Sequence, residues 1–299
     1  MKVLVAGSSG FIGTELCRQL REQGHVVMKL VRGNARMIGE YSWSPDDRTV
    51  DPKAIEAADA IVNLAGVPTG RIPWTPGYKR KILYSRVRGT QTIAEAIATS
   101  DNPPTIFLNG SAVGYYGDQP GVTLTEGSPK GSGFLSDVVE AWEKSAALTP
   151  ATTRVVTFRT GLVVGRGGAF TPLIALTKLG LGARIGSGKQ VWPWVSVHDE
   201  AAAIIHLLTS TLAGPVNIVG PTAATAGETT RTLALALARW HPFVIPTFAL
   251  RLLGDAADDL LLSSQHVVSE RLIGDGFTFR DETIEQAISR TIVQIAPVR

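Results

Sequence analysis

The first thirteen residues constrain the fold more than any other part of the chain. A short apolar run, Val3–Ala6, leads directly into a glycine-rich segment, Gly7–Gly13, and then into an amphipathic stretch that contains Leu16 and Leu20. A buried strand, a glycine turn and a helix in this order begin a dinucleotide-binding βαβ unit, in which the helix N-terminus faces the phosphates.

Each glycine of this segment has an expected role. Gly7 permits the tight turn, Gly10 lets the backbone approach a pyrophosphate, and Gly13 lets the helix pack closely on the strand. The spacing is G-x-x-G-x-x-G rather than G-x-G-x-x-G, and a structural turn without a ligand is the alternative. The place between strand and helix favours a cofactor. The predicted cofactor contacts here are Gly7, Ser8, Ser9, Gly10, Phe11, Ile12 and Gly13.

The end of the second predicted strand indicates which cofactor is bound. The strand His25–Val31 ends at Arg32, where NAD-preferring sites usually place an acid for the ribose 2′-hydroxyl. A guanidinium instead suits a 2′-phosphate, which it can bind bidentately, and Arg36 follows closely. We therefore predict NADP(H) over NAD(H), with a solvated loop cation at Arg32 as the alternative.

Composition narrows the class of protein. The chain has 299 residues, 44% of them apolar, which suits one large α/β unit with a smaller appendage. The net charge of +3 and the lack of a dense basic run do not favour nucleic acid. The basic cluster on a predicted helix is interpreted as a solvated face, with phosphate contact as the alternative. That cluster is Lys79, Arg80, Lys81, Arg86 and Arg88.

Redox chemistry and location follow from the same survey. Cys17 is the only cysteine, so an internal disulfide is impossible. The chain enters a strand at once, without the pattern of a signal peptide, and no apolar segment reaches membrane-spanning length. We expect a cytoplasmic protein with a small-molecule substrate and no membrane partner; the sequence does not indicate the oligomeric state.

Strands and helices alternate through the first half, which predicts a parallel, doubly wound α/β sheet of the Rossmann type. The expected strands include 60–66, 105–109 and 154–159, and the expected helices 78–99 and 134–148. Ligands bind at the carboxyl ends of such strands. The turns at 7–13, 32, 64–66, 109–111 and 160–161 should therefore converge, which adds Leu64, Ala65, Gly66 and Asn109 to the predicted cofactor contacts.

The second half is less regular. The glycine-rich segment Gly165–Gly188 is either mobile over the cleft or simply rich in turns. One of Trp192 and Trp194 is expected to line a pocket, and Asp199 is the expected N-cap of a helix. We predict a Rossmann domain over 1–165, with 191–220 returning to it, and a smaller, mainly helical lid lobe from 166–190 and 221–299.

Several of these segments together resemble the extended short-chain dehydrogenase/reductase superfamily, also called the NAD-dependent epimerase/dehydratase family. The shared landmarks are Gly7–Gly13, Asn63–Gly66, Val87–Thr90 and Val197–Glu200. Further details are similar to an atypical branch, the epimerase family proteins or sugar-nucleotide epimerases: Ser111–Gly117, Arg159–Gly161, Gly186–Gln190, Phe248–Gly254 and Gly276–Phe279. The resemblance runs nearly end to end, but this branch has no firmly assigned reaction.

The usual catalytic pair of the superfamily is missing. Its mechanism needs Tyr-x-x-x-Lys on one helix face, where the lysine lowers the tyrosine pKa. None of the five tyrosines has a lysine four residues later, and the helix expected to carry the pair, Phe134–Glu140, contains neither residue. The resemblance implies the same, because the atypical branch lacks the pair.

Three residues remain near the expected nicotinamide position. The resemblance places Ser111 where the superfamily keeps its catalytic Ser or Thr, and Tyr116 near its Tyr-Gly turn. Tyr115 or Tyr116 could act as a general acid; without a lysine a tyrosine pKa stays near about 10, which favours reduction over oxidation. The alternative is that Ser111 only caps the strand end and both tyrosines pack under the cleft.

Other ionisable residues are interpreted as structural. Asp137, Glu140 and Glu143 are expected on a helix surface. His198-Asp199-Glu200 lacks a second histidine at ligand spacing, so no metal site is predicted.

The predicted function is an NADP(H)-dependent oxidoreductase that reduces a small carbonyl, enone or imine. One alternative is a sugar-nucleotide epimerase, which needs the transient oxidation that the missing pair impairs. Another is a non-catalytic NADP(H)-binding regulator, which would bind the cofactor without turnover.

Overall fold

The computed structural model describes residues 1–293, and an eight-stranded sheet forms its centre. The strand order is β13-β8-β6-β5-β1-β2-β3-β4, and all neighbours are parallel except β3 and β4. The strands are β1 (Lys2–Ala6), β2 (Val26–Arg32), β3 (Glu40–Ser44), β4 (Thr49–Val50), β5 (Ala60–Asn63), β6 (Ile106–Ala112), β8 (Arg154–Thr160) and β13 (Gly214–Ile218). The predicted Rossmann-type sheet is confirmed.

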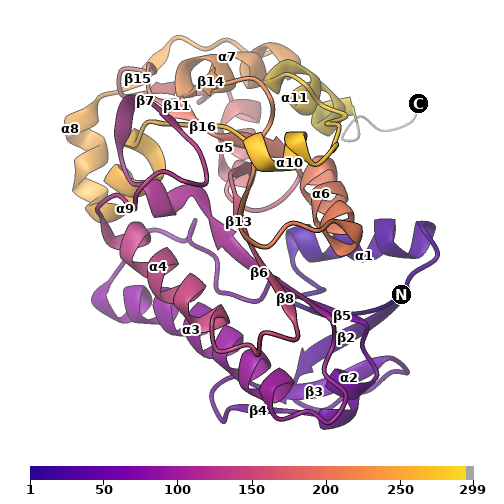
Figure 1. Cartoon of the computed structure of the whole chain (residues 1–299). Helices are drawn as coiled ribbons and strands as arrows, with labels where there is room; N and C mark the ends of the chain where they lie inside the picture. Colours follow the sequence, from indigo (N-terminus) through magenta and orange to yellow (C-terminus); the bar gives the residue numbers. More distant parts are fainter. Residues whose placement is uncertain (294–299) are drawn as a thin grey trace.

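Helices cover both faces of this sheet (Figure 1). Side chains alternate along β1, so Val3 and Val5 pack with α1 (Phe11–Glu22) and α6 (Val197–Thr209). Leu4 and Ala6 point to the opposite face, where α2 (Pro52–Glu56) and α3 (Pro76–Ala98) cover the sheet. The helix α4 (Phe134–Ala146) lies beside α3. A strand buried on both faces explains why Val3–Ala6 is apolar without interruption.

Helix starts follow from local sequence. Thr75 caps α3 by accepting a hydrogen bond from the backbone N–H of Tyr78 at 3.2 Å, and Pro76 occupies the first turn. For α6 the N-cap prediction was wrong: Ser196, not Asp199, accepts the capping bond. The carboxylate of Asp199 instead accepts from the backbone N–H groups of Arg280 and Asp281, both at 3.0 Å.

The remaining elements are short. The helices are η1 (Val113–Tyr116), α5 (Phe170–Lys178), α7 (Ala226–Ala236), α8 (Thr247–Leu250), η2 (Arg251–Leu253), α9 (Asp255–Ala257), η3 (Asp258–Leu262), α10 (Glu270–Gly274) and α11 (Ile284–Val293). Four strand pairs accompany them: β9 (Leu162–Val164) with β12 (Trp194–Ser196), β11 (Val191–Trp192) with β14 (Ala224–Thr225), β10 (Ala183–Ile185) with β15 (Phe243–Ile245), and β7 (Gln119–Leu124) with β16 (Gln265–Val267).

This arrangement bears on the predicted lobes. The segment Gly165–Gly188 contains α5 and β10, so it is more than a run of turns. The strand β7 comes from the range assigned to the Rossmann domain but pairs with β16 near the end of the chain. The domain boundaries themselves stay a prediction. No helix within residues 1–293 has the length and apolar character needed to cross a bilayer.

The two tryptophans are alike in burial. Trp192 and Trp194 are 5% and 1% exposed, so both pack in the core, and a pocket-lining role for one of them stays a prediction. They sit on short strands of two different pairs, packed against the C-terminal helices, which removes the alternation that a single strand would give.

Candidate functional site

The glycine turn has the geometry that its spacing predicts. Gly7 adopts φ +80°, a conformation that glycine tolerates best, and its carbonyl accepts from the N–H of Gly10 at 3.0 Å. The helix α1 begins at Phe11, and its cap, Gly10, offers no side chain. A Cβ on Gly13 would lie 2.2 Å from the Gly7 oxygen. The first turn of α1 is therefore packed against the turn as closely as the chain allows.

Three neighbouring strands bring a second turn to the same edge. Ala6 is paired with Asn63 and Asn63 with Asn109, so β1, β5 and β6 end side by side. A Cβ on Gly7 would lie 2.8 Å from the oxygen of Leu64, which shows how closely the two turns approach. Gly66 is exposed at this edge. The turns 7–13 and 64–66 therefore come together, as parallel topology requires.

The predicted contacts differ in what they can reach. Ser9 and Gly10 are exposed, and Ser8 is half-buried; neither serine hydroxyl has a hydrogen-bond partner within residues 1–293. Phe11 packs under the glycine-rich segment, because a Cβ on Gly167 would lie 2.3 Å from its ring. Ile12 packs into the core beside α6. The open polar groups are thus those of residues 8–10.

Arg32 lies at the end of β2 and is exposed. Its guanidinium makes no ion pair or hydrogen bond with any residue that the structure describes. The neighbouring strand places Trp43 next to it, but that ring is only 4% exposed and faces Gly89 of α3. Trp43 is therefore a packing residue, and Arg32 is the charged group available at this end of the site.

Asn109 is enclosed rather than open. It is fully buried, its Oδ1 accepts from Asn63 Nδ2 at 2.8 Å and from Thr90 Oγ1 at 2.9 Å, and its Nδ2 donates to the Gly110 carbonyl. These bonds tie β5, β6 and α3 together behind the strand ends. A direct side-chain contact with a cofactor would require Asn109 to leave these partners.

Ser111 belongs to a polar cluster that the pairing of β6 with β8 brings together. The strand β6 continues past Asn109 to Ala112, and Ser111 is paired with Arg159 of β8, so both side chains point to the α4 face. Glu143 of α4 completes the cluster. It accepts from Ser111 Oγ at 2.6 Å and from Arg159 Nε and Nη2, each at 2.8 Å.

The expectation of a surface role for Glu143 was wrong. Its side chain is 16% exposed and Arg159 only 3%, which makes this a bidentate, nearly buried ion pair. Burial by itself would lower the pKa of Arg159, but its bonds and charge interaction with Glu143 raise that pKa above its ordinary value. The sequence did carry a clue: Glu143 follows the buried Val139 by four residues, and therefore shares its helix face.

The two tyrosines of η1 have different environments. Tyr116 is fully buried, donates to Asn217 Oδ1 at 2.7 Å and accepts from Arg159 Nη1 at 3.0 Å. Burial raises the pKa of its phenol, against the opposite influence of Arg159. Tyr115 is half-buried, its ring lies 3.5 Å from the Arg159 guanidinium carbon, and its hydroxyl has no partner among the described residues. Of the two tyrosines of η1, Tyr115 is therefore the one whose phenol has no partner within residues 1–293.

The predicted basic helix face contains two exceptions, the first of which is Lys79, which is half-buried and pairs with Asp255. Arg80 and Lys81 are exposed as expected, but Arg86 turns inward, and burial lowers the pKa of its guanidinium to about 10. Its position explains this: it follows the buried Ile82 by four residues and precedes the buried Thr90 by four. Arg86 therefore lies on the inner stripe of α3.

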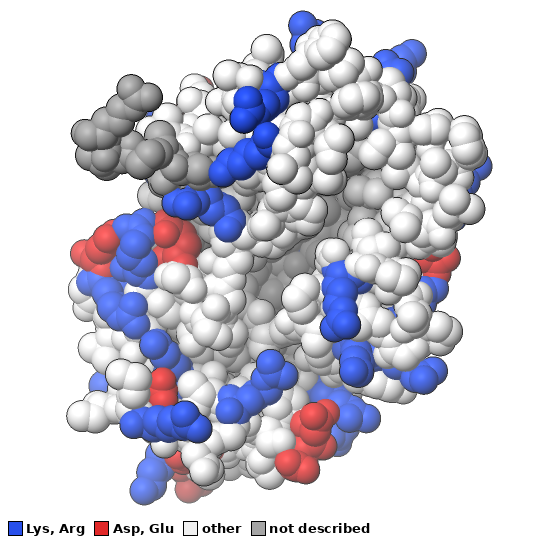
Figure 2. All heavy atoms as spheres, turned by 180° about the vertical axis from the view of Figure 1, so that it is seen from behind, with Lys and Arg blue, Asp and Glu red and all other residues white. Residues whose placement is uncertain are grey.

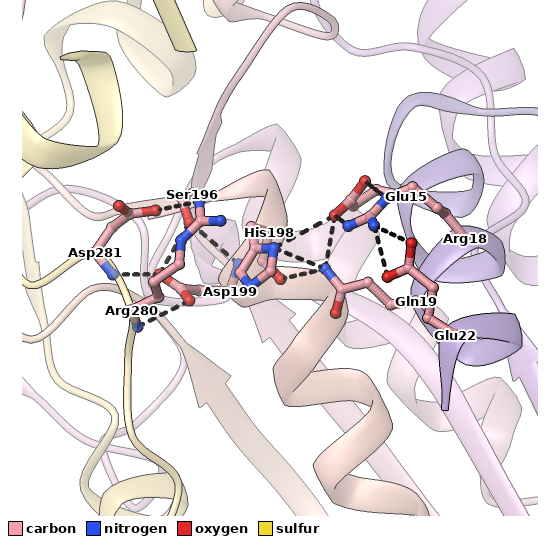
Figure 3. A network of polar contacts seen from close by, with 9 residues as sticks. All are labelled: Glu15, Arg18, Gln19, Glu22, Ser196, His198, Asp199, Arg280 and Asp281. Atoms are coloured by element: carbon pink, nitrogen blue, oxygen red, sulfur yellow. Dashed lines mark hydrogen bonds and ion pairs between the residues drawn. The ribbon is translucent and has the colours of Figure 1, made fainter. Parts of the chain in front are cut away.

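The histidine motif has a structural role (Figure 3). His198 Nδ1 lies 3.1 Å from Gln19 Nε2 and 3.5 Å from Glu15, both on α1. Glu200 is fully buried and bonded to Thr160, and burial raises its pKa to about 8. Within residues 1–293 no group of His, Cys, Asp or Glu side chains is arranged to hold a metal ion.

Charge is distributed unevenly over the back of the molecule (Figure 2). The surface is hollowed near its middle, and Lys and Arg side chains lie around the hollow on several sides. A face of this kind favours an anionic ligand.

The fold and the turn define a Rossmann-type protein with a nucleotide-binding edge. A sequence profile of the NAD dependent epimerase/dehydratase family matches residues 3–220, and one of a domain of unknown function (DUF1731) matches residues 245–291. The chain belongs to the NAD dependent epimerase/dehydratase family.

Individual relatives match over nearly the whole chain. An epimerase family protein of Mycobacterium leprae is 37% identical, covering 96% of this chain and 94% of the relative. The crystal structure of the human epimerase family protein SDR39U1 (isoform 2) with NADPH has a TM-score of 0.90 at 32% identity, covering 98% of this chain and 99% of the human one. A nucleoside-diphosphate sugar epimerase of Corynebacterium glutamicum has a TM-score of 0.79 at 30% identity, covering 98% of this chain and 58% of the other.

Proposed function

We propose that this chain is an NADP(H)-dependent oxidoreductase that reduces a small carbonyl, enone or imine. The observation that carries the proposal is the free phenol of Tyr115, held against Arg159 just beyond strand β6. Strand β6 is followed in the sheet by β5 and then β1, which lead into the turns 64–66 and 7–13. Support for the cofactor comes from the human relative that holds NADPH, and from the cradle at Gly7 and Gly13, which a Cβ would fill.

The residues divide the work as follows. The turn 7–13 and the open α1 N-terminus would hold the diphosphate, and Arg32 the 2′-phosphate. When bound, NADPH supplies the hydride. Tyr115 would donate the proton that the substrate oxygen or nitrogen needs as the hydride arrives.

Ser111 has a different part from the one its position first indicates. Its only hydroxyl proton is donated to Glu143, so it has no proton left to polarise a substrate carbonyl. Its oxygen can still accept a hydrogen bond. We therefore assign proton donation to Tyr115. Ser111, Glu143 and Arg159 would position the groups of the site, and the buried Tyr116 would stabilise this cluster through its hydrogen bond with Arg159.

The cofactor assignment predicts that Arg32→Ala raises the Kd for NADPH by about 10-fold or more and leaves the Kd for NADH unchanged. The physical reason is that only NADPH has the 2′-phosphate that the free guanidinium can bind. A fluorescence titration with each dinucleotide measures this. Arg231→Ala, an exposed arginine of α7, is the matched control. Equal loss for both dinucleotides would contradict the assignment.

The reaction assignment predicts NADPH consumption with at least one member of a panel of small aldehydes, ketones, enones and imines. Tyr115→Phe should lower that rate by about 100-fold or more, the usual contribution of a general acid, without changing the Kd for NADPH. Tyr116→Phe keeps the buried ring and should have the smaller effect on rate. NADPH binding without turnover of any substrate would favour a regulator, and release of tightly bound dinucleotide on denaturation would favour an epimerase.

A further inference from the structure

Arg86 is a half-buried, inward-facing charge for which residues 1–293 supply no opposite charge. Its side chain comes off the inner stripe of α3, and its guanidinium carbon lies 5.2 Å from the centre of the Trp142 ring. One nitrogen, Nη1, donates to the carbonyls of Val67 and Ile82, both at 3.2 Å. No carboxylate lies within ion-pair distance of it in the part of the chain that the structure describes.

The other nitrogens of Arg86 are not used. Neither Nε nor Nη2 has a hydrogen-bond partner among residues 1–293, yet neither belongs to the buried polar atoms that are sealed off without a partner. Both therefore retain contact with solvent. A guanidinium presents its N–H groups as a planar fork, so two free nitrogens on one arginine form a ready site for a two-oxygen anion.

The guanidinium that carries this fork lies beside the candidate site. An ideal Cβ on Gly66, in the exposed turn after β5, would be 3.4 Å from the guanidinium carbon. The Trp142 ring beneath Arg86 also touches Gly110, since a Cβ there would lie 3.1 Å from the ring. Arg86 thus stands between the 64–66 turn and the strand that carries Ser111.

Holding such a charge partly away from water has a cost, because an ion without a partner loses part of its hydration there. Arg159 on β8 shows the alternative. It is buried together with Glu143, whose carboxylate neutralises its charge within the chain. Arg86 has no such partner within the described residues. An anion that binds from solution can therefore supply its counter-charge.

We propose that Arg86 is an anion-binding residue that takes a carboxylate or phosphate group against the Leu64–Gly66 turn. The group has two possible sources, a substrate carboxylate or the diphosphate of the cofactor. A substrate source would deepen the proposed function, on which it rests, by making the substrate an acid-bearing carbonyl or imine compound.

The test uses the whole chain with and without saturating NADPH, and malonate or inorganic phosphate as probes at constant ionic strength. The melting midpoint is measured against probe concentration for the wild type, Arg86→Met and Arg86→Lys. Arg80→Met, an exposed arginine of the same helix, is the matched control. Bound NADPH occupies the glycine turn. A shift of the melting midpoint by the probe that persists at saturating NADPH therefore comes from another site.

We expect both probes to raise the midpoint of the wild type and of Arg80→Met, with apparent affinity lowered about 10-fold or more in Arg86→Met. Arg86→Lys, which keeps the charge without the fork, should be intermediate. A probe effect that persists with NADPH identifies the substrate as the source. An effect abolished by NADPH, together with a Kd for NADPH raised about 10-fold or more in Arg86→Met, identifies the cofactor.

The free protein provides a second readout. Replacing an unpaired, half-buried charge by an apolar side chain of similar length should leave the midpoint without anions unchanged or higher. A large fall in that midpoint, with the same probe response in Arg86→Met and wild type, would overturn the proposal. Arg86 would then serve only to donate hydrogen bonds to the Val67 and Ile82 carbonyls. No probe response in the wild type and an unchanged Kd for NADPH in Arg86→Met would also overturn the proposal. These outcomes do not depend on turnover, so a failed carbonyl panel leaves them interpretable.

Discussion

Glu143→Gln is expected to lower the free energy of unfolding by about 3 kcal/mol. The substitution keeps the shape of the side chain but removes the charge that neutralises Arg159, which is 3% exposed. An unpaired guanidinium would then remain under the sheet edge, with one of its two bonds to the carboxylate lost. Chemical denaturation of the purified variant measures the change.

The same helix offers a matched control for this result. Glu140, one turn earlier, is 39% exposed and pairs with Lys144 at 2.8 Å. Glu140→Gln makes the same chemical change at the surface and should cost under about 0.5 kcal/mol. The double variant Glu143→Gln with Arg159→Met should recover part of the loss, since neither charge then remains. Similar effects at 140 and 143 would mean that the buried pair contributes no more than a surface one.

Gly13→Ala is expected to weaken NADPH binding by roughly 10- to 100-fold, because an extra methyl group in a close-packed contact costs about 1–3 kcal/mol. The added Cβ would lie 2.2 Å from the Gly7 oxygen and 2.9 Å from the Ser8 Cα, both backbone atoms that cannot rotate away. The start of α1 must therefore move relative to the turn. Titration of the variant with NADPH measures the loss.

Gly274→Ala serves as the control for this experiment. Gly274 lies in α10, has no positive φ, and a Cβ there meets no atom within 4 Å. It should bind NADPH like the wild type. If Gly13→Ala also bound normally, the close packing of α1 on the turn would not determine cofactor affinity, and the assignment of Gly7–Gly13 as the diphosphate site would fall.

The site combines one paired and one unpaired arginine around the strand end that carries Ser111. The pair at Glu143 and Arg159 contacts Ser111 and the tyrosines of η1, while Nε and Nη2 of Arg86 have no partner within residues 1–293. The helix α4, on which the Tyr-x-x-x-Lys pair was expected, contributes Glu143 instead. In the proposed reaction, positive charge near the substrate would come from β8 and α3 rather than from α4.

Parts of this protein were determined by sequence alone. The apolar run, the glycine turn and the amphipathic helix at residues 3–22 are local patterns, and each follows from backbone sterics or from a period of two or 3.6 residues. Alternation of such segments predicted the parallel sheet, and therefore the meeting of the turns at 7–13 and 64–66 at one edge. Arg32 could be placed at this edge because it ends a strand.

Only the tertiary structure decided which way the polar side chains near that edge point. Ser111 meets Arg159 through the register of β6 on β8, and Glu143 reaches both because α4 packs that face inward. In the sequence, Arg86 is indistinguishable from the surface cations beside it. Only the packing of α3 places its side chain on the inner face of the helix. Such pairings join residues far apart in the chain, and no local period records them; their energies depend on burial and on partners that exist only once the sheet and its helices have assembled.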